Sequence, residues 1–120
     1  ADTLYRARGK GPPEQYYFDK ARAHNQASIK MIQSNKFEDA IILLEKTVRQ
    51  NPRILSARFN LAKLLLEFKN DPQKAKTHLN AALNLNPTAN QRQVLRGHLV
   101  RTNSMMFTLN IFSMTIPLQN

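Results

Sequence analysis

Three histidines and eight acidic residues are the side chains of this chain that could act as acids and bases or bind a metal ion. His24, His78 and His98 lie far apart in the sequence, and no acid stands beside them at the spacing that zinc sites on a helix use. The acids lack the secluded apolar setting that would make one carboxyl an acid and another a base. We therefore expect each histidine to be structural, with no metal and no cofactor.

The residue types needed for covalent catalysis or phosphate binding are also missing. The chain has no cysteine, which excludes thiol catalysis, disulfides and thiolate metal sites. Gly9 and Gly11 lead into two prolines and Gly97 stands alone, so no glycine loop can hold a phosphate. No serine nucleophile motif is present. These patterns predict a protein that is not an enzyme.

Two segments of the chain share one pattern. In each, an alanine is followed four residues later by a leucine and twelve residues later by the proline of an Asn-Pro pair. The alanine and the leucine therefore share a helical face. The residues are Ala40, Leu44 and Pro52 in the first copy and Ala75, Leu79 and Pro87 in the second. The two prolines are 35 residues apart, which indicates an internal repeat.

The first halves of the two copies agree as well. The spacing of His24, Ala27, Ser28 and Met31 recurs in Arg58, Leu61, Ala62 and Leu65. This pattern resembles the tetratricopeptide repeat, although the family's tryptophan position holds His24 and Arg58. The resemblance implies antiparallel helical hairpins stacked as a short α-solenoid. Small residues should then lie where the helices cross, namely Ser28, Ala40, Ala62 and Ala75.

The periodicity predicts an all-α fold with helices over about 14–34, 36–50, 54–69 and 72–85 and a fifth from near Thr88. Gly97 falls at the position of Ser28 and Ala62, so the fifth helix resembles the first helix of a third, degenerate repeat. The polar run 102–104 indicates a break. The apolar stretch 105–118 fits either a helical stripe or an alternating strand. An unrelated bundle of amphipathic helices is the alternative to the repeat.

The composition divides the chain into three parts. Residues 1–13 combine basic residues with glycine and proline and should form a flexible arm. Residues 14–101 form the repeat domain, and 102–120 an apolar docking tail. Two repeats are few for a solenoid, so flanking helices or a partner should cover its ends. The tail residues expected to dock are Met105, Leu109, Phe112 and Ile116.

Net charge is the strongest compositional signal. Eighteen lysines and arginines face eight acids, which gives +10, and no acid follows Asp71. Such an imbalance favours RNA, an acidic protein surface or anionic lipid as partner, whereas the simpler alternative is a solvated basic surface. The predicted basic surface comprises Arg6, Arg8, Lys10, Lys74, Lys76, Arg92, Arg96 and Arg101.

The resemblance also implies a concave groove, lined by the first helix of each hairpin, that receives a segment of another protein. The lining residues would be Asn25, Ile29, Ile32, Phe59, Asn60, Lys63 and Leu66. Asn60 matches one residue of the subtype that grips a C-terminal carboxylate. The other positions of that clamp do not match, because they hold Asn25, Ile29, Gln91 and Leu95. We reject the clamp.

The sequence thus predicts a noncatalytic scaffold or adaptor that belongs to a larger complex of several proteins. The alternative is a basic structural subunit of a ribonucleoprotein, such as a ribosome, that contacts RNA. The stretch 105–118 is too short and too polar to cross a bilayer. An alanine at position 1 fits loss of an initiator methionine or cleavage of a targeting segment. Cytoplasm and organelle, such as the mitochondrion, both remain open.

Overall fold

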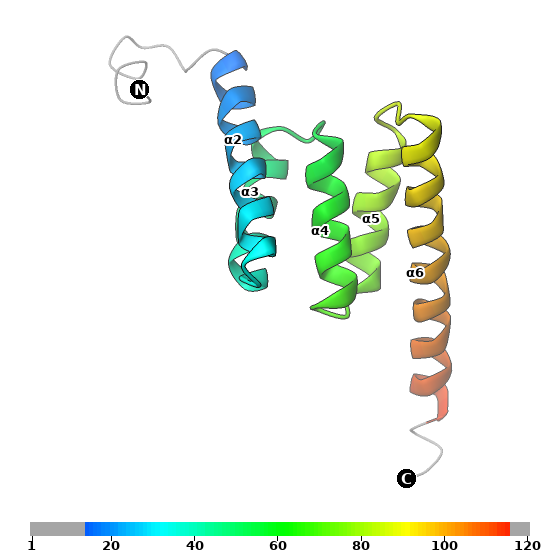
Figure 1. Ribbon diagram of the computed structural model, residues 1–120. Coiled ribbons are helices and arrows are strands. Elements are labelled where there is room, and N and C mark those ends of the chain that lie inside the picture. The colour runs from blue at the N-terminus through cyan, green and yellow to red at the C-terminus, as the bar shows by residue number, and fades with distance from the viewer. Residues whose placement is uncertain (1–13, 116–120) are drawn as a thin grey trace. The chain divides into compact units, whose positions relative to one another are not determined.

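The computed structural model describes the backbone of residues 14–115 and the side chains of residues 14–109 and Ile111. These residues form five helices and no strand (Figure 1). The helices are α2 (Glu14–Gln33), α3 (Phe37–Gln50), α4 (Leu55–Glu67), α5 (Pro72–Leu83) and α6 (Ala89–Thr115). The all-α prediction is confirmed, and the predicted boundaries of the first four helices agree to within two residues.

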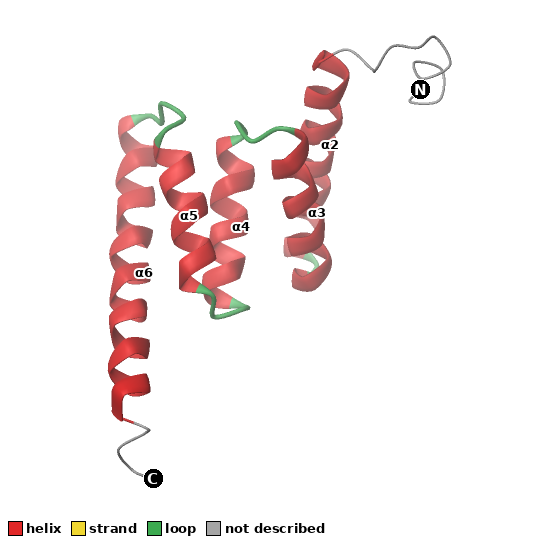
Figure 2. Ribbon diagram, turned by 180° about the vertical axis from the view of Figure 1, so that it is seen from behind, coloured by secondary structure: helices red, strands yellow, loops and turns green. Residues whose placement is uncertain are grey.

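The chain divides into two compact units, residues 1–57 and 58–120, with the boundary in the first turn of α4. In the first unit, α2 and α3 form an antiparallel pair joined by the turn at residues 34–36 (Figure 2). Asn35, the middle residue of this turn, is in the left-handed region, at φ 60°. Asparagine tolerates this conformation better than most residues, which explains its presence in the turn.

The same device recurs 35 residues later. Asn70, at φ 52°, lies in the turn between α4 and α5, and Asn86, at φ 53°, lies in the loop between α5 and α6. α5 begins at Pro72, where the missing N–H costs nothing, and the Asp71 carboxylate accepts a hydrogen bond from the Lys74 backbone N–H at 3.2 Å. In both units, therefore, the hairpin turn depends on an asparagine with positive φ.

The residues predicted to be small where helices cross are all buried. Ser28 and Ala40 lie within the first unit, and Ala62 and Ala75 within the second, and none of the four has accessible surface. Leu44 and Leu79, each four residues after one of these alanines, are buried too. The small and the large residue of each copy thus lie on the buried side of their helix, as the shared spacing predicts.

In the second unit, α4 and α5 lie side by side and α6 packs against α5 (Figures 1 and 2). α6 starts with a capping box: the Thr88 hydroxyl accepts from the Gln91 backbone N–H at 3.2 Å, and the Gln91 side-chain carbonyl accepts from the Thr88 N–H at 2.9 Å. Two backbone donors that have no partner within the helix are thereby satisfied.

α6 contradicts the predicted break at residues 102–104. It runs without interruption for 27 residues, or about 40 Å at 1.5 Å per residue, and its last turns extend beyond the ends of α4 and α5 (Figure 1). Thr102 explains the continuity, because its side chain is buried and its hydroxyl donates to the His98 carbonyl at 2.6 Å. The stretch 105–115 is therefore helix and not strand. Residues 1–13 and 116–120 lie outside the described part.

Gly97 aligns with Ser28 and Ala62 in the sequence but does not pack as they do. It is exposed, and a Cβ built on it would meet no atom within 4 Å. α6 packs through Leu95 and Thr102, both buried and seven residues apart, so Gly97 lies on the other side of the helix. It does not occupy a crossing point equivalent to those of Ser28 and Ala62.

Candidate functional site

One face of α4 meets α6 through a cluster of aromatic and charged side chains. Phe59 and Lys63 are four residues apart and share this face. The Phe59 ring packs edge to face against the His98 imidazole, with 5.1 Å between centroids, and Lys63 Nζ lies 6.0 Å from the centre of the Phe59 ring. The contact joins aromatic packing to a cation held over a ring face.

His98 is the most constrained polar group of this cluster. Its Nδ1 atom is buried and forms no hydrogen bond with any described residue. Burial lowers the pKa of His98, and the positive charges of Arg101 and Lys63 lower it further, whereas Glu67 acts in the opposite direction. The imidazole is therefore neutral at pH 7, and it acts here as an aromatic packing partner.

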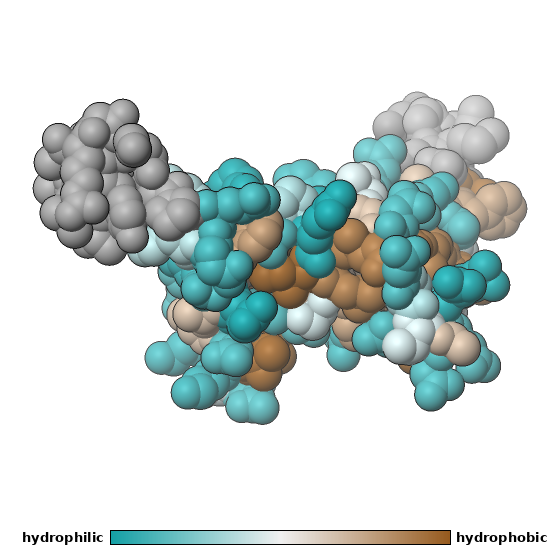
Figure 3. Space-filling view, turned by 90° about the horizontal axis from the view of Figure 1, so that it is seen from above, coloured by the Kyte–Doolittle hydropathy of each residue, from teal (hydrophilic) through white to brown (hydrophobic). Residues whose placement is uncertain are grey.

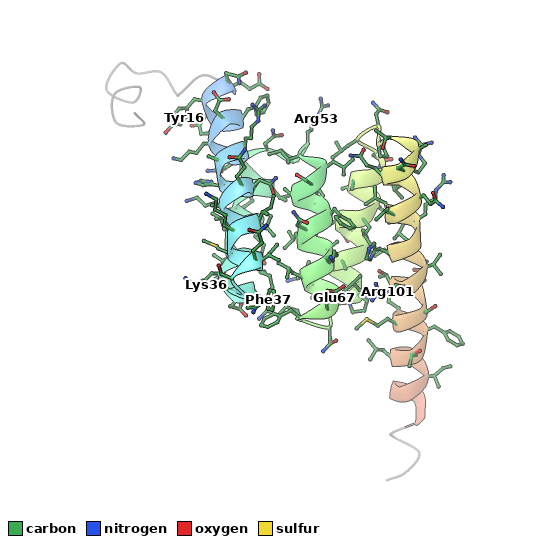
Figure 4. The ribbon with its side chains drawn as sticks, in the orientation of Figure 1. Tyr16, Lys36, Phe37, Arg53, Glu67 and Arg101 are labelled. Carbon is green, nitrogen blue, oxygen red and sulfur yellow. The ribbon has the colours of Figure 1, made fainter. Side chains whose placement is uncertain are left out.

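A hollow of about 340 Å³ opens beside this cluster, near the end of α4. Its lining residues are Leu66, Glu67, Asn70, Arg101 and Met105. Figure 4 shows Glu67 on α4 and Arg101 on α6 at the same level of the unit. The lining combines the apolar side chains of Leu66 and Met105 with the charged side chains of Glu67 and Arg101. A second hollow of about 230 Å³ is lined by Asp71, Pro72, Gln73, Met106 and Leu109.

The predicted groove residues are distributed over both units. Asn25, Ile29 and Ile32 lie on α2 in the first unit, and the other four lie on α4 in the second. Asn25 is only 7% exposed, and its Nδ2 donates to Ser56 Oγ at 2.8 Å, so it lies beneath the surface. Ile29 is exposed, whereas Leu66 is buried. The remaining members, Ile32, Phe59, Asn60 and Lys63, are half-buried.

The other two histidines join helices. His24 Nδ1 lies 2.8 Å from Gln50 Oε1, which connects α2 to α3. His78 Nδ1 lies 2.9 Å from Arg58 Nη1, which connects α5 to α4. Burial lowers the pKa of His78, and the charges of Arg58 and Lys74 add to this effect. Within the described residues, no group of three histidine, cysteine or acidic side chains is close enough to hold a metal ion.

The basic surface is largely exposed where the structure describes it. Lys74, Arg92, Arg96 and Arg101 are exposed and Lys76 is half-buried. Arg6, Arg8 and Lys10 lie outside the described residues. No described helix is both long and apolar enough to span a bilayer.

The most exposed large apolar side chains of α6 are ones that sequence reasoning did not assign to a surface. Val100 is 65% exposed and Phe107 66% exposed. By contrast, Met105 and Leu109 of the predicted tail each line one of the two hollows. The side chain of Phe112 and the whole of Ile116 lie outside the described part. Figure 3 shows both hydrophobic and hydrophilic residues on the face of the molecule that is seen from above.

No model of a known protein family matches this chain, and no curated protein sequence matches it either.

Proposed function

We propose that this chain is a noncatalytic adaptor that binds segments of other proteins within a larger complex. The observation that carries the proposal is the exposure of Phe107, Leu109 and Ile111 in the last part of α6. The last turns of this helix extend past the ends of α4 and α5 (Figure 1). Large exposed apolar side chains gathered on one element are characteristic of protein interaction surfaces. A partner that covers them would gain hydrophobic stabilisation.

The repeated hairpins support the same function. Their likeness to tetratricopeptide repeats, and the buried alanines at Ala40 and Ala75, fit a scaffold whose role is to present surface. The polar groups argue in the same direction. His24 and His78 each contact a side chain of a neighbouring helix, and His98 packs against Phe59, so all three histidines are engaged in holding helices together.

Gentle purification of the protein from its own cells, followed by native mass spectrometry, tests this proposal. The expected result is a complex with at least one different protein in defined stoichiometry. Substitution of Phe107 by aspartate should reduce the recovered partner, whereas the same change at Ile42, an exposed side chain on α3, should not. A stable monomer that retains no partner at low salt would contradict the proposal.

RNA binding is the second candidate function, and the exposed cations Arg92, Arg96 and Lys74 favour it. No acid follows Asp71 to offset them. Phosphate contacts by several such residues release counterions, so affinity for RNA should fall steeply as salt rises. Electrophoretic mobility shifts with a structured RNA at about 0.05 M and 0.2 M salt test this, with an expected loss on the order of 10³-fold for six contacts. Absence of binding at the lower salt would exclude this candidate.

A further inference from the structure

A heptad pattern runs along the outer face of α6. The positions Gln93, Gly97, Val100, Ser104, Phe107 and Ile111 are separated alternately by four and three residues. This spacing is that of the a and d positions of a coiled coil, and it places all six on one face of a helix. Leu95 and Thr102, which anchor α6 to its unit, occupy the opposite f positions. The a and d positions therefore face away from the core.

The apolar members of this face are among the exposed side chains of the second unit. Val100 and Phe107, at successive d positions, are about two-thirds exposed, and Ile111 at an a position is 48% exposed. Aliphatic and aromatic residues at a and d normally fill the seam between two helices. The exposure of Val100 and Phe107 means that no described residue of the chain covers these two side chains.

Gly97 supplies a second, independent observation. Glycine inside a helix disfavours it, and nothing within 4 Å of a Cβ at this position requires the small residue. Ser104, the next a position, is small as well. Small residues at a seam allow the backbone of a second helix to approach closely. A helix seated on this face would explain a glycine that the chain's own packing does not.

The residues that flank the seam indicate which charge a partner helix should carry. Arg96 at a g position and Arg101 at an e position are both exposed, and no flanking position from Val94 to Asn110 is acidic. In coiled coils the e and g residues pair with opposite charges on the partner helix. Glutamate or aspartate beside the partner's apolar residues would meet both arginines.

A parallel second copy of this chain fits the flanks poorly. Parallel pairing places the g residue of one helix next to the e residue five positions later on its partner. Arg96 of one copy would then face Arg101 of the other, and the repulsion would occur twice. The acids of an acidic partner helix would instead be attracted to both Arg96 and Arg101.

From these observations we infer that the seam of α6, from Gln93 to Ile111, is the docking site of an acidic amphipathic helix of another protein. The inference rests on the proposed adaptor function and names the surface and the partner class. The partner helix presents apolar residues at heptad spacing toward Val100 and Phe107, and its acids lie toward Arg96 and Arg101.

Two synthetic peptides of about three heptads test the inference with the full chain. Both carry leucine at a and d, and one has glutamate and the other lysine at e and g, so like charges oppose self-association of each peptide. Fluorescence anisotropy at about 0.05 M salt should show at least tenfold tighter binding of the glutamate peptide. Similar affinity for both peptides, or no binding of either, would overturn the inference.

Charge reversal at Arg96 and Arg101 provides the sharpest variant. The R96E/R101E protein should prefer the lysine peptide, whereas the matched control R22E/R49E, which changes the net charge equally on the first unit, should keep the original preference. Phe107→Asp should weaken binding at least tenfold and Ile42→Asp should leave it unchanged. If R22E/R49E changes the preference between the two peptides as much as R96E/R101E does, the preference depends on net charge alone and a seam on α6 is refuted.

Gly97→Leu separates docking from folding. Leucine favours the helix and has open space, so the thermal midpoint should stay or rise, while affinity for the glutamate peptide should fall at least tenfold. Unaltered affinity would overturn the inference. A dimer in sedimentation equilibrium that F107D dissociates would also overturn it, because the occupant would then be a second copy. If peptide binding fails but a partner still copurifies, the adaptor proposal stands and only this surface is wrong.

Discussion

His78 links α5 to α4 through a bond whose direction fixes its protonation state. Arginine cannot accept a hydrogen bond, so Arg58 Nη1 must donate to His78 Nδ1, which must carry no proton. The imidazole is then either neutral with its proton on Nε2 or unable to make this contact. Burial and the neighbouring charges of Arg58 and Lys74, which lower the pKa of His78, favour that neutral form.

The stability of the fold should therefore decrease in mild acid. A histidine whose pKa is lower in the folded than in the unfolded state contributes its full stability above about pH 6.5 and loses it as the pH falls through the lowered pKa. Urea unfolding between pH 7.5 and 5 should show this fall. His78→Asn keeps an oxygen acceptor for Arg58 but does not titrate, so the fall should be smaller in the variant. His98, whose pKa is also lowered, accounts for part of the remainder.

Ala40 and Ala75 report whether the helices of each unit cross as closely as the structure shows. Both are fully buried, so leucine at either position would have to displace its neighbours. Overpacking of this kind costs typically about 1–3 kcal/mol of unfolding free energy. Urea denaturation followed by circular dichroism should show that loss for each variant, whereas Ala23→Leu, at an exposed position of α2, should have little effect. Unchanged midpoints for Ala40→Leu and Ala75→Leu would show that these crossings are loose.

At the scale of the elements, the capping box of α6 contributes measurably to the free energy of unfolding. Thr88→Ala removes the acceptor of the Gln91 N–H, and loss of such a cap costs about 1 kcal/mol. Chemical denaturation should detect the change, and Thr88→Ser, which keeps the hydroxyl, should restore most of it. Thr108→Ala, within the same helix, should be nearly neutral, because that hydroxyl only donates to the Ser104 carbonyl of its own helix. Equal losses for T88A and T88S would argue against the cap.

Helix boundaries were predictable because local residues determine them. Asn35 and Asn70 form the hairpin turns through their own conformational preference, and Asp71 followed by Pro72 starts α5. These signals act within a few residues of the boundary they set. The sequence alone was therefore sufficient to locate four of the five helices and the small buried residues of both copies.

On α6, tertiary packing decides what the local sequence pattern does not. Thr102 appeared as part of a polar break, yet burial against the unit and a bond to the His98 carbonyl keep it helical. Gly97 aligns with Ser28 in the sequence but is exposed, because the buried pair Leu95 and Thr102 sets the rotation of the helix. A heptad count through Val100 and Phe107 would have revealed the outward face from the sequence.

At the scale of the whole molecule, the dominant property is charge. A net charge of +10 on 120 residues creates repulsion among like charges that is relieved when the chain unfolds and expands. The exposed arginines of α6 contribute to it, and no acid after Asp71 compensates them. An acidic partner would remove part of this repulsion on binding, so the same charges that oppose the isolated fold would favour a complex.

Salt should accordingly stabilise the isolated chain. The Debye length falls from about 30 Å at 0.01 M to about 3 Å at 1 M, so repulsion between separate exposed cations is largely screened at the upper end. The thermal midpoint should rise between these limits. Arg96→Glu, which lowers the net charge by two, should raise the midpoint at low salt and have almost no effect at high salt.

The reciprocal change supplies the control. Glu45→Lys, at an exposed position of α3, raises the net charge by two and should lower the midpoint at low salt. Differential scanning calorimetry of the original chain, Arg96→Glu and Glu45→Lys over a range of sodium chloride concentrations measures how the thermal midpoint of each changes with salt. If the midpoint of the original chain falls as salt rises, attractive ion pairs outweigh repulsion. Repulsion would then give no reason to expect an acidic partner, and the seam on α6 would be the remaining argument for one.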